Sequence, residues 1–349
     1  MKNLSIFNKF IFIINILLAL ITLAGFLLPY VAPKKYPVLS VLSLGFPLLL
    51  LFNIFFLIYW GIQLKKQIIL TLFVLLIGLP FYKLFYKLTG TEKEIETNDI
   101  TLMSYNVHLF NKFDWMPNVD VTDDVAAFVK VHNADIVCLQ EFTPNANFKL
   151  SGFKYKHIVT KGKYIQSGLA IYSKYPIISR GDLDFNNSNN NAIYVDVNIN
   201  GNLLRIYTMH LESIKIGEDI NTDPSEIYEK KSRKIFNKLK KAFKDQQEQA
   251  EQILKHREYV KSPVIVCGDM NNSAFSYVYR TIRGELNDSF VEAGKGFGKS
   301  YDFALFPARI DYILTDKQLE VKEFKTHQDF KKSDHFPVIS RFKINKKEE

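Results

Sequence analysis

The 349-residue chain contains only two cysteines, Cys138 and Cys267, and both lie within apolar stretches. A disulfide framework is therefore not expected, and buried free thiols are the simpler interpretation. Residues 1–90 contain no Asp, Glu or Arg, although they include eight Lys. This segment carries +8 of the net charge of +9, which leaves about +1 for the other 259 residues. The net positive charge of the whole chain is therefore no evidence that the protein binds nucleic acid.

Charged residues are also missing from two long apolar runs near the N-terminus. Residues 10–33 and 36–64 form uncharged runs of 24 and 29 residues, and about 20 residues suffice to cross the hydrocarbon core of a membrane. A third run, residues 67–82, is shorter and contains Pro80. The first run exceeds the usual core of a cleaved signal peptide. We therefore predict about three transmembrane helices, joined by tight Pro-Lys-Lys and Leu-Lys-Lys turns.

The predicted spans contain no Asp, Glu, Lys, Arg or His. A transport pathway or proton relay has no support without such groups, so anchoring is the expected role. Four Lys lie on each side of the spans, and the positive-inside rule does not decide the orientation. An odd number of spans places the C-terminal part opposite the N-terminus. With the N-terminus inside, we expect an integral protein of a bacterial-type inner or plasma membrane with its large domain on the extracytoplasmic side.

The rest of the chain indicates one folded domain after a short connection. Residues 1–90 are predicted to be the anchor, residues 91–98 a polar, acidic linker, and residues 99–346 the folded domain. Many strands with few helices, and no repeats, predict an α/β domain of two packed sheets with helices outside. Strands are expected at residues 100–107, 135–139, 168–172, 193–199, 203–209, 264–267, 310–314, 321–324 and 338–343, and helices at 123–131 and 223–259.

The predicted helix at residues 223–259 has apolar residues at helical spacing, among them Leu239, Phe243 and Ile253, so it packs by one face. Its first half is crowded with basic residues: Lys230, Lys231, Arg233, Lys234, Lys238, Lys240, Lys241 and Lys244. A solvated helix face is the ordinary explanation. Attraction to phosphates or to an anionic membrane surface is the second one.

One strand end combines an acid with an amide. The apolar residues 264–267 predict a buried strand, and they are followed by Gly268, Asp269, Met270 and Asn271. Residues at positions i and i+2 of an extended backbone project to the same side. Asp269 and Asn271 are therefore expected to point toward one place beyond the strand. Asp and Asn are also ordinary turn formers, so the weight of this pair depends on partners elsewhere.

Such partners occur at the ends of other predicted strands. Each has an ordinary explanation: Asn106 as a turn residue, Asp311 as a surface charge partner and His335 as a loop residue. Their recurrence at strand ends makes a shared site more probable than six coincidences. The set comprises Asn106, Glu141, His210, Asp269 with Asn271, Asp311, and the tripeptide Ser333-Asp334-His335.

The Gly-Asp-x-Asn motif with a downstream Ser-Asp-His-x-Pro, in this order, resembles the endonuclease/exonuclease/phosphatase superfamily. These metal-dependent phosphoesterases include DNase I, the abasic-site endonucleases, neutral sphingomyelinases and inositol-polyphosphate 5-phosphatases. The resemblance covers roughly residues 98–345. It implies a four-layer α/β sandwich whose active site lies where strand-end loops of both sheets meet. It also implies hydrolysis of a phosphodiester by in-line attack of water.

The resemblance implies a metal site and a water-activating pair. Glu141 would be the principal ligand of Mg²⁺, with Mn²⁺ as the alternative ion, and Asn106 would lie beside it. Asp334 would be a further carboxylate on the metal side. Asp269 would orient or deprotonate the attacking water, and Asn271 would hold that water or a phosphate oxygen. Few protein ligands of hard oxygen type suit Mg²⁺, which retains waters and accepts phosphate oxygens.

Two histidines complete the implied site. His335 would contact the scissile phosphate, and Asp311 would pair with it and favour the charged imidazolium. His210 would be the second histidine at the phosphate. A metal ion and two histidines together neutralise the charge of the non-bridging oxygens.

The chain departs from the abasic-site endonucleases at one position. There the Asn-Val after the first strand is followed by Asp, whereas His108 stands here. This departure weakens DNA repair as the specific role and leaves one carboxylate fewer for the metal. A surface loop residue is the preferred interpretation of His108, and a contact with metal or substrate is the alternative.

The expected function is therefore that of a membrane-anchored, Mg²⁺-dependent phosphodiesterase acting on nucleic acid or on lipid head groups. The anchor favours a phospholipid- or sphingomyelin-type phosphodiesterase over a nuclease, as does the near-neutral charge of the soluble part. Nothing in the sequence indicates a protein partner. A catalytically retired, membrane-tethered binding domain is the alternative from another class, and the complete set of site residues argues against it.

Overall fold

The computed structural model describes residues 4–90, 93–117, 119–145, 147–186, 188–214, 228–303 and 306–345. It consists of two compact units, here called the helical unit and the sheet unit. The helical unit comprises Met1–Tyr86, Lys215–Gln247 and Ala274–Arg280. The sheet unit comprises Lys87–Ile214, Glu248–Ser273 and Thr281–Glu349. The predicted division at residues 1–90, 91–98 and 99–346 stays a prediction.

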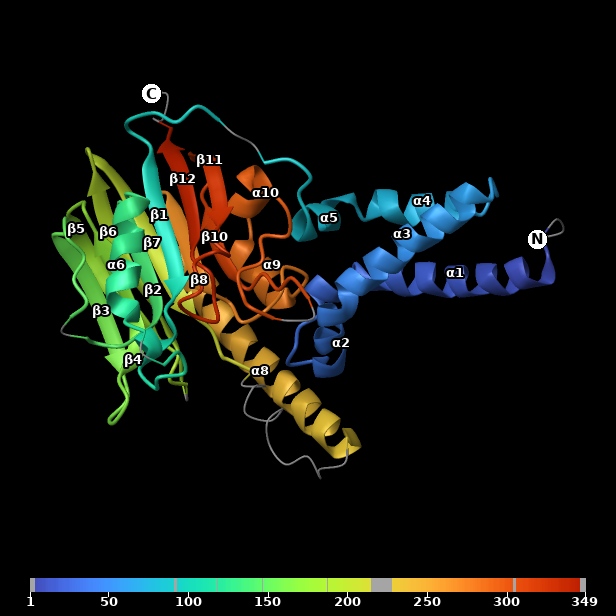
Figure 1. Ribbon diagram of the computed structural model, residues 1–349, viewed down its shortest axis with the longest axis horizontal. Coiled ribbons are helices and arrows are strands. Elements are labelled where there is room, and N and C mark those ends of the chain that lie inside the picture. Colours follow the sequence, from blue (N-terminus) through green and yellow to red (C-terminus); the bar gives the residue numbers. More distant parts are fainter. Residues whose placement is uncertain are drawn as a thin grey trace. The chain divides into compact units, whose positions relative to one another are not determined.

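The sheet unit contains two mixed sheets of six strands each (Figure 1). The first has the order β11-β12-β1-β2-β4-β3, with bounds β1 Ile100–Asn106, β2 Ile136–Phe142, β3 Tyr155–Lys161, β4 Ser167–Ser173, β11 Leu319–Thr326 and β12 Val338–Ile344. The second has the order β5-β6-β7-β8-β10-β9, with bounds β5 Ile177–Asp184, β6 Asn191–Ile199, β7 Asn202–His210, β8 Val264–Asp269, β9 Asn287–Asp288 and β10 Asp311–Thr315.

The two sheets pack face to face around one apolar core. Alternate residues of β1 serve two layers: Ile100 and Leu102 join the core between the sheets, whereas Met103 and Tyr105 face outward. This burial on both faces explains why apolar residues occur on both sides of the strand. Side chains from β2, β4, β6, β7, β8 and β10 also line the core between the sheets.

Helices cover the outer faces of the sheets. Helix α6 (Val121–Val131) begins at Asp120, whose carboxylate accepts hydrogen bonds from two backbone N–H groups. Its residues Val125 and Val129 pack against the outward side chains of the first sheet. On the second sheet, His256 of α8 (Tyr228–Arg257) lies 2.8 Å from the hydroxyl of Tyr207 in β7. The fold is thus the predicted four-layer α/β sandwich.

Three strands were not predicted, β3, β5 and the two-residue β9, and all three form edges of their sheets. The residues of β3 and β5 are mostly exposed or half-buried, so neither of these strands shows a clear apolar pattern. The predicted helix at residues 223–259 corresponds to α8, and residues 223–227 lie outside the described residues. Two short helices, α9 (Tyr277–Arg283) and α10 (Ser289–Ala293), were also not predicted.

The helical unit contains α1 (Ile6–Gly25), α2 (Pro37–Leu42), α3 (Phe46–Ile62), α4 (Ile68–Ile77) and α5 (Leu79–Phe85), with short 3₁₀ turns at Leu28–Tyr30 and Ser43–Gly45. Two stretches, Ile6–Tyr30 and Pro37–Ile62, are long and apolar enough to cross a membrane. Helices α4 and α5 bend by 67° at their junction. Pro80 in the first turn of α5 accounts for the break, because proline cannot continue a helix through its missing N–H. The third predicted span is therefore a bent pair of helices.

Candidate active site

Strand pairing brings the predicted polar residues to one end of the sheets. β1 and β2 are parallel, and Asn106 pairs with Gln140, so Glu141 follows at the same end. β7 and β8 are also parallel, and His210 pairs directly with Asp269. β10 runs antiparallel to β8, so its first residue, Asp311, lies opposite Asp269. Four strand ends and one strand start therefore converge.

Gly268 allows β8 to lie close to β7 just before Asp269. Its φ is +122°, and a Cβ at this position would lie 2.1 Å from the carbonyl oxygen of Met209. Side-chain-bearing residues rarely adopt this φ, and none fits that space. The glycine of the Gly-Asp-x-Asn motif thus fixes where the carboxylate of Asp269 emerges.

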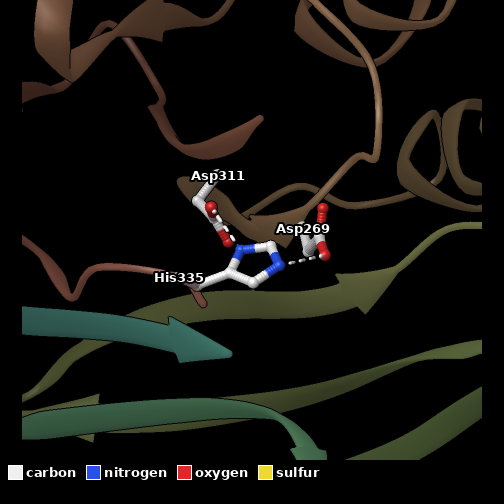
Figure 2. A group of neighbouring side chains, drawn as sticks. All are labelled: Asp269, Asp311 and His335. Carbon is white, nitrogen blue, oxygen red and sulfur yellow. Dashed lines mark hydrogen bonds and ion pairs between the residues drawn. The ribbon is translucent and has the colours of Figure 1, made fainter. Parts of the chain in front are cut away.

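The ring of His335 lies between the carboxylates of Asp311 and Asp269 (Figure 2). Its Nδ1 is 2.9 Å from Asp311 Oδ2, and its Nε2 is 3.6 Å from Asp269 Oδ2. Only 4% of His335 is exposed. Burial alone would lower the pKa of His335, but the charges of Asp311 and Asp269 outweigh it and raise the pKa to about 10. His335 is therefore an imidazolium at neutral pH.

Asp269 is fully buried at the centre of the group. Burial raises the pKa of its carboxyl to about 6, although the nearby histidines act in the opposite direction. Its Oδ2 accepts a hydrogen bond from Asn106 Nδ2 at 3.1 Å, and its Oδ1 accepts one from the Asn271 N–H at 2.7 Å. A carboxylate with this pKa is ionised at neutral pH and still accepts a proton readily.

Glu141 stands at an irregularity of β2 and adopts a φ of 49°, which is uncommon for a residue with a side chain. This conformation directs it toward the other strand ends. Glu141 Oε1 accepts a hydrogen bond from Asn106 Nδ2 at 3.2 Å and lies 3.7 Å from His210 Nε2. The same His210 nitrogen lies 3.6 Å from Asp269 Oδ2. The side chain of Glu141 keeps 25% of its surface exposed.

Asn106 lies beside Glu141, but it presents its amide nitrogen rather than its oxygen. The backbone N–H of His108 donates to Asn106 Oδ1 at 3.1 Å, which turns Nδ2 toward Glu141 and Asp269. In this arrangement Asn106 orients two carboxylates through hydrogen bonds. The predicted place of Asn106 on the metal side stays a prediction.

Asn271 is close to Asp269 for a different reason from the one predicted. β8 ends at Asp269, and Asn271 has a left-handed φ of 48°, so the extended i, i+2 geometry does not apply. Its Nδ2 donates to the carbonyl oxygen of Leu211 at 3.0 Å. Asn271 thereby links the segment after β8 to the segment after β7.

Asp334 lies at the edge of the site together with His108. Asp334 Oδ1 is 3.1 Å from His108 Nδ1 and accepts a hydrogen bond from Ser333 Oγ. Burial opposes ionisation of Asp334, but the hydrogen bond from His108 and the charge of His335 lower the pKa of Asp334 to about 2. His108 stacks on Trp115, with ring centroids 3.8 Å apart. A left-handed φ of 45° turns His108 toward Asp334, and its side chain keeps 30% of its surface exposed. Its interpretation as a surface loop residue, with contact to metal or substrate as the alternative, stays a prediction.

The donor atoms suit a hard divalent cation. Oxygen or nitrogen atoms of Asp269, Asp311 and His335 lie within 4.8 Å of one another, close enough to hold a metal ion. His335, however, faces a carboxylate with each ring nitrogen and so carries both protons, which leaves no lone pair for a metal. Glu141 and Asp334 are carboxylates with partly exposed side chains, the donor type that Mg²⁺ prefers.

The structure adds two residues that sequence reasoning missed. The ring of Tyr301 lies 4.9 Å from that of His335, and burial followed by the charges of Asp334 and Asp269 raises the pKa of its hydroxyl. No sequence signal marks Tyr301. Gln140 is fully buried, and its Nε2 donates to Ser104 of β1 and to Thr208 of β7, which joins the two sheets beneath the site. The sequence feature that could have identified Gln140 is the presence of a glutamine within an apolar strand, directly before Glu141.

Comparisons with known proteins agree with this architecture. A family model described as the endonuclease/exonuclease/phosphatase family matches residues 103–335. Another, described as a domain of unknown function, matches residues 8–85. No curated protein matches the chain.

Solved structures share the fold at low sequence identity. An endonuclease/exonuclease/phosphatase from Beutenbergia cavernae DSM 12333 is 16% identical with a TM-score of 0.51, covering 71% of this chain and 72% of its own. TDP2 from D. rerio, complexed with a single-strand DNA product, is 16% identical with a TM-score of 0.51, covering 70% and 99%. The human Nocturnin catalytic domain with bound sulfate is 16% identical with a TM-score of 0.53, covering 74% and 98%. These similarities establish the fold alone.

Proposed function

Since the chain belongs to the endonuclease/exonuclease/phosphatase family, we propose that it is a membrane-anchored, Mg²⁺-dependent phosphoesterase that hydrolyses phosphodiester bonds. The observation that supports this most is the buried imidazolium of His335 between Asp311 and Asp269 at the converging strand ends. Attack of water on a phosphate requires a base that accepts the proton of the water and positive charge near the phosphate oxygens. A carboxylate of raised pKa beside a fixed positive charge supplies both.

Asp269 is proposed to orient the attacking water and to accept its proton. Its pKa of about 6 leaves it ionised at neutral pH, and its two oxygens are held by Asn106 and Asn271. Asn271 is proposed to assist by holding the water or a phosphate oxygen. Because its backbone N–H already binds Asp269, any such contact would come from the side-chain amide.

His335 and His210 are proposed to donate hydrogen bonds to the non-bridging oxygens of the phosphate. Asp311 holds His335 Nδ1 at 2.9 Å, whereas Nε2 faces Asp269 at the longer distance of 3.6 Å. The Nε2–H therefore stays available to a substrate oxygen while Asp311 keeps the ring in place. His210 Nε2 lies at similarly long distances from Glu141 and Asp269.

Glu141 is proposed as the principal ligand of Mg²⁺, or of Mn²⁺ in its place, with Asp334 as a further carboxylate. Asn106 is proposed to lie with them on the metal side, beside Glu141, to which its Nδ2 donates a hydrogen bond at 3.2 Å. When bound, such an ion supplies positive charge to the phosphate oxygens. Asp334 is ready for this role because the pKa of its carboxyl is about 2.

The proposed setting is a membrane, with the sheet unit on the extracytoplasmic side. Two stretches long and apolar enough to span support the anchoring, and the bent pair α4–α5 would supply the third span. A fusion reporter at the C-terminus tests the side: a reporter active only outside the cytoplasm is expected. A reporter active only in the cytoplasm would overturn the orientation and leave the chemistry unaffected.

The proposed substrate is a phosphodiester presented at the membrane, a phospholipid or sphingolipid head group, with nucleic acid as the second candidate. The relative from D. rerio was solved with a DNA product, which keeps the nuclease candidate in view. The full-length protein in detergent micelles should hydrolyse a generic aryl phosphodiester with Mg²⁺ and lose that activity in EDTA. Parallel assays of plasmid cleavage and of head-group release from liposomes then separate the two substrates. Undiminished hydrolysis in EDTA would overturn the proposed chemistry.

A further inference from the structure

The first half of α8 is a basic segment that the proposed chemistry does not use. Residues 228–247 include eight Lys or Arg and only two acidic residues, Glu229 and Asp245. This half belongs to the helical unit, the unit that also contains both stretches long enough to span a membrane. The side chains of Lys230, Arg233 and Lys241 are exposed.

The basic residues share one face of the helix. Their spacing of three and four positions places them on a single stripe. The apolar residues Leu239, Ala242 and Phe243 are buried on another face. A shallow hollow runs along the stripe, lined by Lys230, Arg233, Lys234, Asn237, Lys238 and Lys241. We call this stripe the basic face of α8.

A hydrogen bond connects α8 to the turn between the two apolar stretches. The backbone N–H of Lys34 donates to Gln247 Oε1 at 2.8 Å. Lys34 lies between Ile6–Tyr30 and Pro37–Ile62. If both stretches cross a membrane, this turn lies at the membrane surface, and so does Gln247. Arg280 adds a further cation nearby, with its guanidinium 4.0 Å from the ring of Tyr30.

The basic face is therefore within reach of lipid head groups. Lys241 and Lys230 precede Gln247 by 6 and 17 residues, which corresponds to roughly 9 and 26 Å along the helix. A cluster of roughly four to eight Lys or Arg on a helix next to a membrane-spanning segment is typical of sites that bind anionic lipid head groups. A basic face that lay several screening lengths away from the membrane would not respond to lipid charge.

We propose that the basic face of α8 binds the phosphate groups of anionic lipids at the surface of the membrane that anchors the chain. This inference rests on the anchoring part of the proposed function and is independent of the phosphoesterase chemistry. Because such attraction acts between charges in water, it weakens as salt shortens the screening length.

The test places a fluorophore in the hollow of the full-length chain. Cys138 and Cys267 are both buried, so a cysteine introduced by Asn237→Cys is the one that reacts. The labelled protein is reconstituted into phosphatidylcholine vesicles with or without phosphatidylglycerol, each with a lipid that bears a nitroxide quencher on its head group. We expect quenching to rise about threefold with the anionic lipid and to fall again in high salt.

A charge-neutralised variant and a matched control distinguish an effect of the basic face from an effect of the total charge of the protein. The variant replaces Lys230, Arg233, Lys234, Lys238 and Lys241 by Gln, which keeps helix propensity. The control replaces an equal number of exposed lysines in the sheet unit by Gln: Lys149, Lys154, Lys156, Lys163 and Lys261. The variant should lose the response to phosphatidylglycerol, and the control should retain it.

The outcomes distinguish this inference from the proposed anchoring. Quenching that is equal in neutral and anionic vesicles, or unchanged in the charge-neutralised variant, overturns the role of the basic face. The salt titration of the unmodified helix decides the matter even if the variant fails to fold. Flotation with phosphatidylcholine vesicles in high salt tests anchoring separately. A chain that does not float overturns the anchoring, and with it this inference, without bearing on phosphodiester hydrolysis.

Discussion

Both units of the molecule bury neutral polar side chains, but among the described residues only the sheet unit also buries acidic and basic ones. In the helical unit, Asn15 Oδ1 accepts hydrogen bonds from Trp60 Nε1 at 2.9 Å and from Thr71 Oγ1 at 3.1 Å. Asn53 Nδ2 donates to Thr22 Oγ1 at 2.8 Å. In the sheet unit neutral groups also meet, such as Gln140 with Ser104 and Thr208, but buried ionisable groups meet there as well, with Asp269 and His335 at their centre.

This difference indicates that buried polar side chains serve structure in the helical unit and also chemistry in the sheet unit. Hydrogen bonds between neutral amides and hydroxyls of different helices hold those helices together, and each contributes only about 1 kcal/mol to stability. Ionisable groups in a low-dielectric site shift one another's pKa values, which is useful for moving protons and binding phosphate. Substitutions in the two units should therefore produce opposite patterns of activity and stability.

The largest expected effect is on turnover by the Asp269→Asn variant. The amide keeps the shape of the carboxylate but cannot accept a proton, so kcat for an aryl phosphodiester should fall by about 10³-fold. The thermal unfolding temperature should stay close to that of the original protein. Asp182→Asn, a change at an exposed carboxylate of β5, serves as the control and should leave kcat unchanged. A fully active Asp269→Asn protein would remove the proposed base.

The next effect is on metal dependence. Glu141→Gln retains the size of the side chain but removes the charge of the proposed ligand, so the Mg²⁺ concentration for half-maximal activity should rise on the order of 10–100-fold. A Mg²⁺ titration of activity measures it. If the titration curve matches that of the unmodified enzyme, Glu141 does not hold the ion.

Much of this site could be predicted because strand ends are readable in sequence. Apolar runs that end in Asn106, Glu141, His210 and Asp269 place these residues at the carboxyl ends of strands, and parallel pairing then brings them together. The strands β3 and β5 were not predicted because they lie at sheet edges, where partial exposure removes the alternation that marks a half-buried strand. The strand β9 was not predicted because it has only two residues.

What could not be predicted depends on backbone conformation outside regular strands. His108, Glu141 and Asn271 all have positive φ values, of 45°, 49° and 48°. Such conformations are uncommon for residues with side chains, and no sequence pattern specified them here. They decide that His108 meets Asp334 and that Asn271 reaches Leu211.

The pH dependence of activity should reflect Asp269. Its pKa of about 6 lies above the ordinary value of 3.8, so the carboxyl becomes protonated as pH falls through 6. Activity should then decrease about tenfold for each further pH unit. His335, with a pKa of about 10, remains charged over this range, and activity should fall again as pH rises through 10. A rate that is flat from pH 7 to 4 would contradict the assignment of Asp269.

A smaller effect, on stability, is expected for Gly268→Ala. The new methyl group would meet the carbonyl oxygen of Met209 at 2.1 Å at a φ of +122°, and the free energy of unfolding should fall by about 3 kcal/mol. Gly201→Ala is the matched control, since Gly201 has a φ of +92° with nothing within 4 Å. Chemical unfolding in detergent micelles measures both. Equal losses would show that backbone strain alone matters, and that the close approach to β7 does not.

The smallest effect is expected in the helical unit. Asn15→Leu removes the acceptor for Trp60 and Thr71, which should lower the free energy of unfolding by about 1 kcal/mol. The value of kcat should stay within about twofold of the original. Thermal unfolding and turnover of one preparation give both numbers. A large loss of activity with unchanged stability would contradict the view that Asn15 serves structure and that the chemistry belongs to the sheet unit alone.

The central claim is that Asp269 and His335 act as one unit in phosphodiester hydrolysis, and a double-variant cycle tests it most directly. Turnover of an aryl phosphodiester with Mg²⁺ is measured for Asp269→Asn, His335→Ala and the combined variant. The account predicts a loss of about 10³-fold for each single variant and little further loss for the combination, because residues that act together are not additive. Activity that survives His335→Ala, or losses that multiply in the double variant, would contradict it.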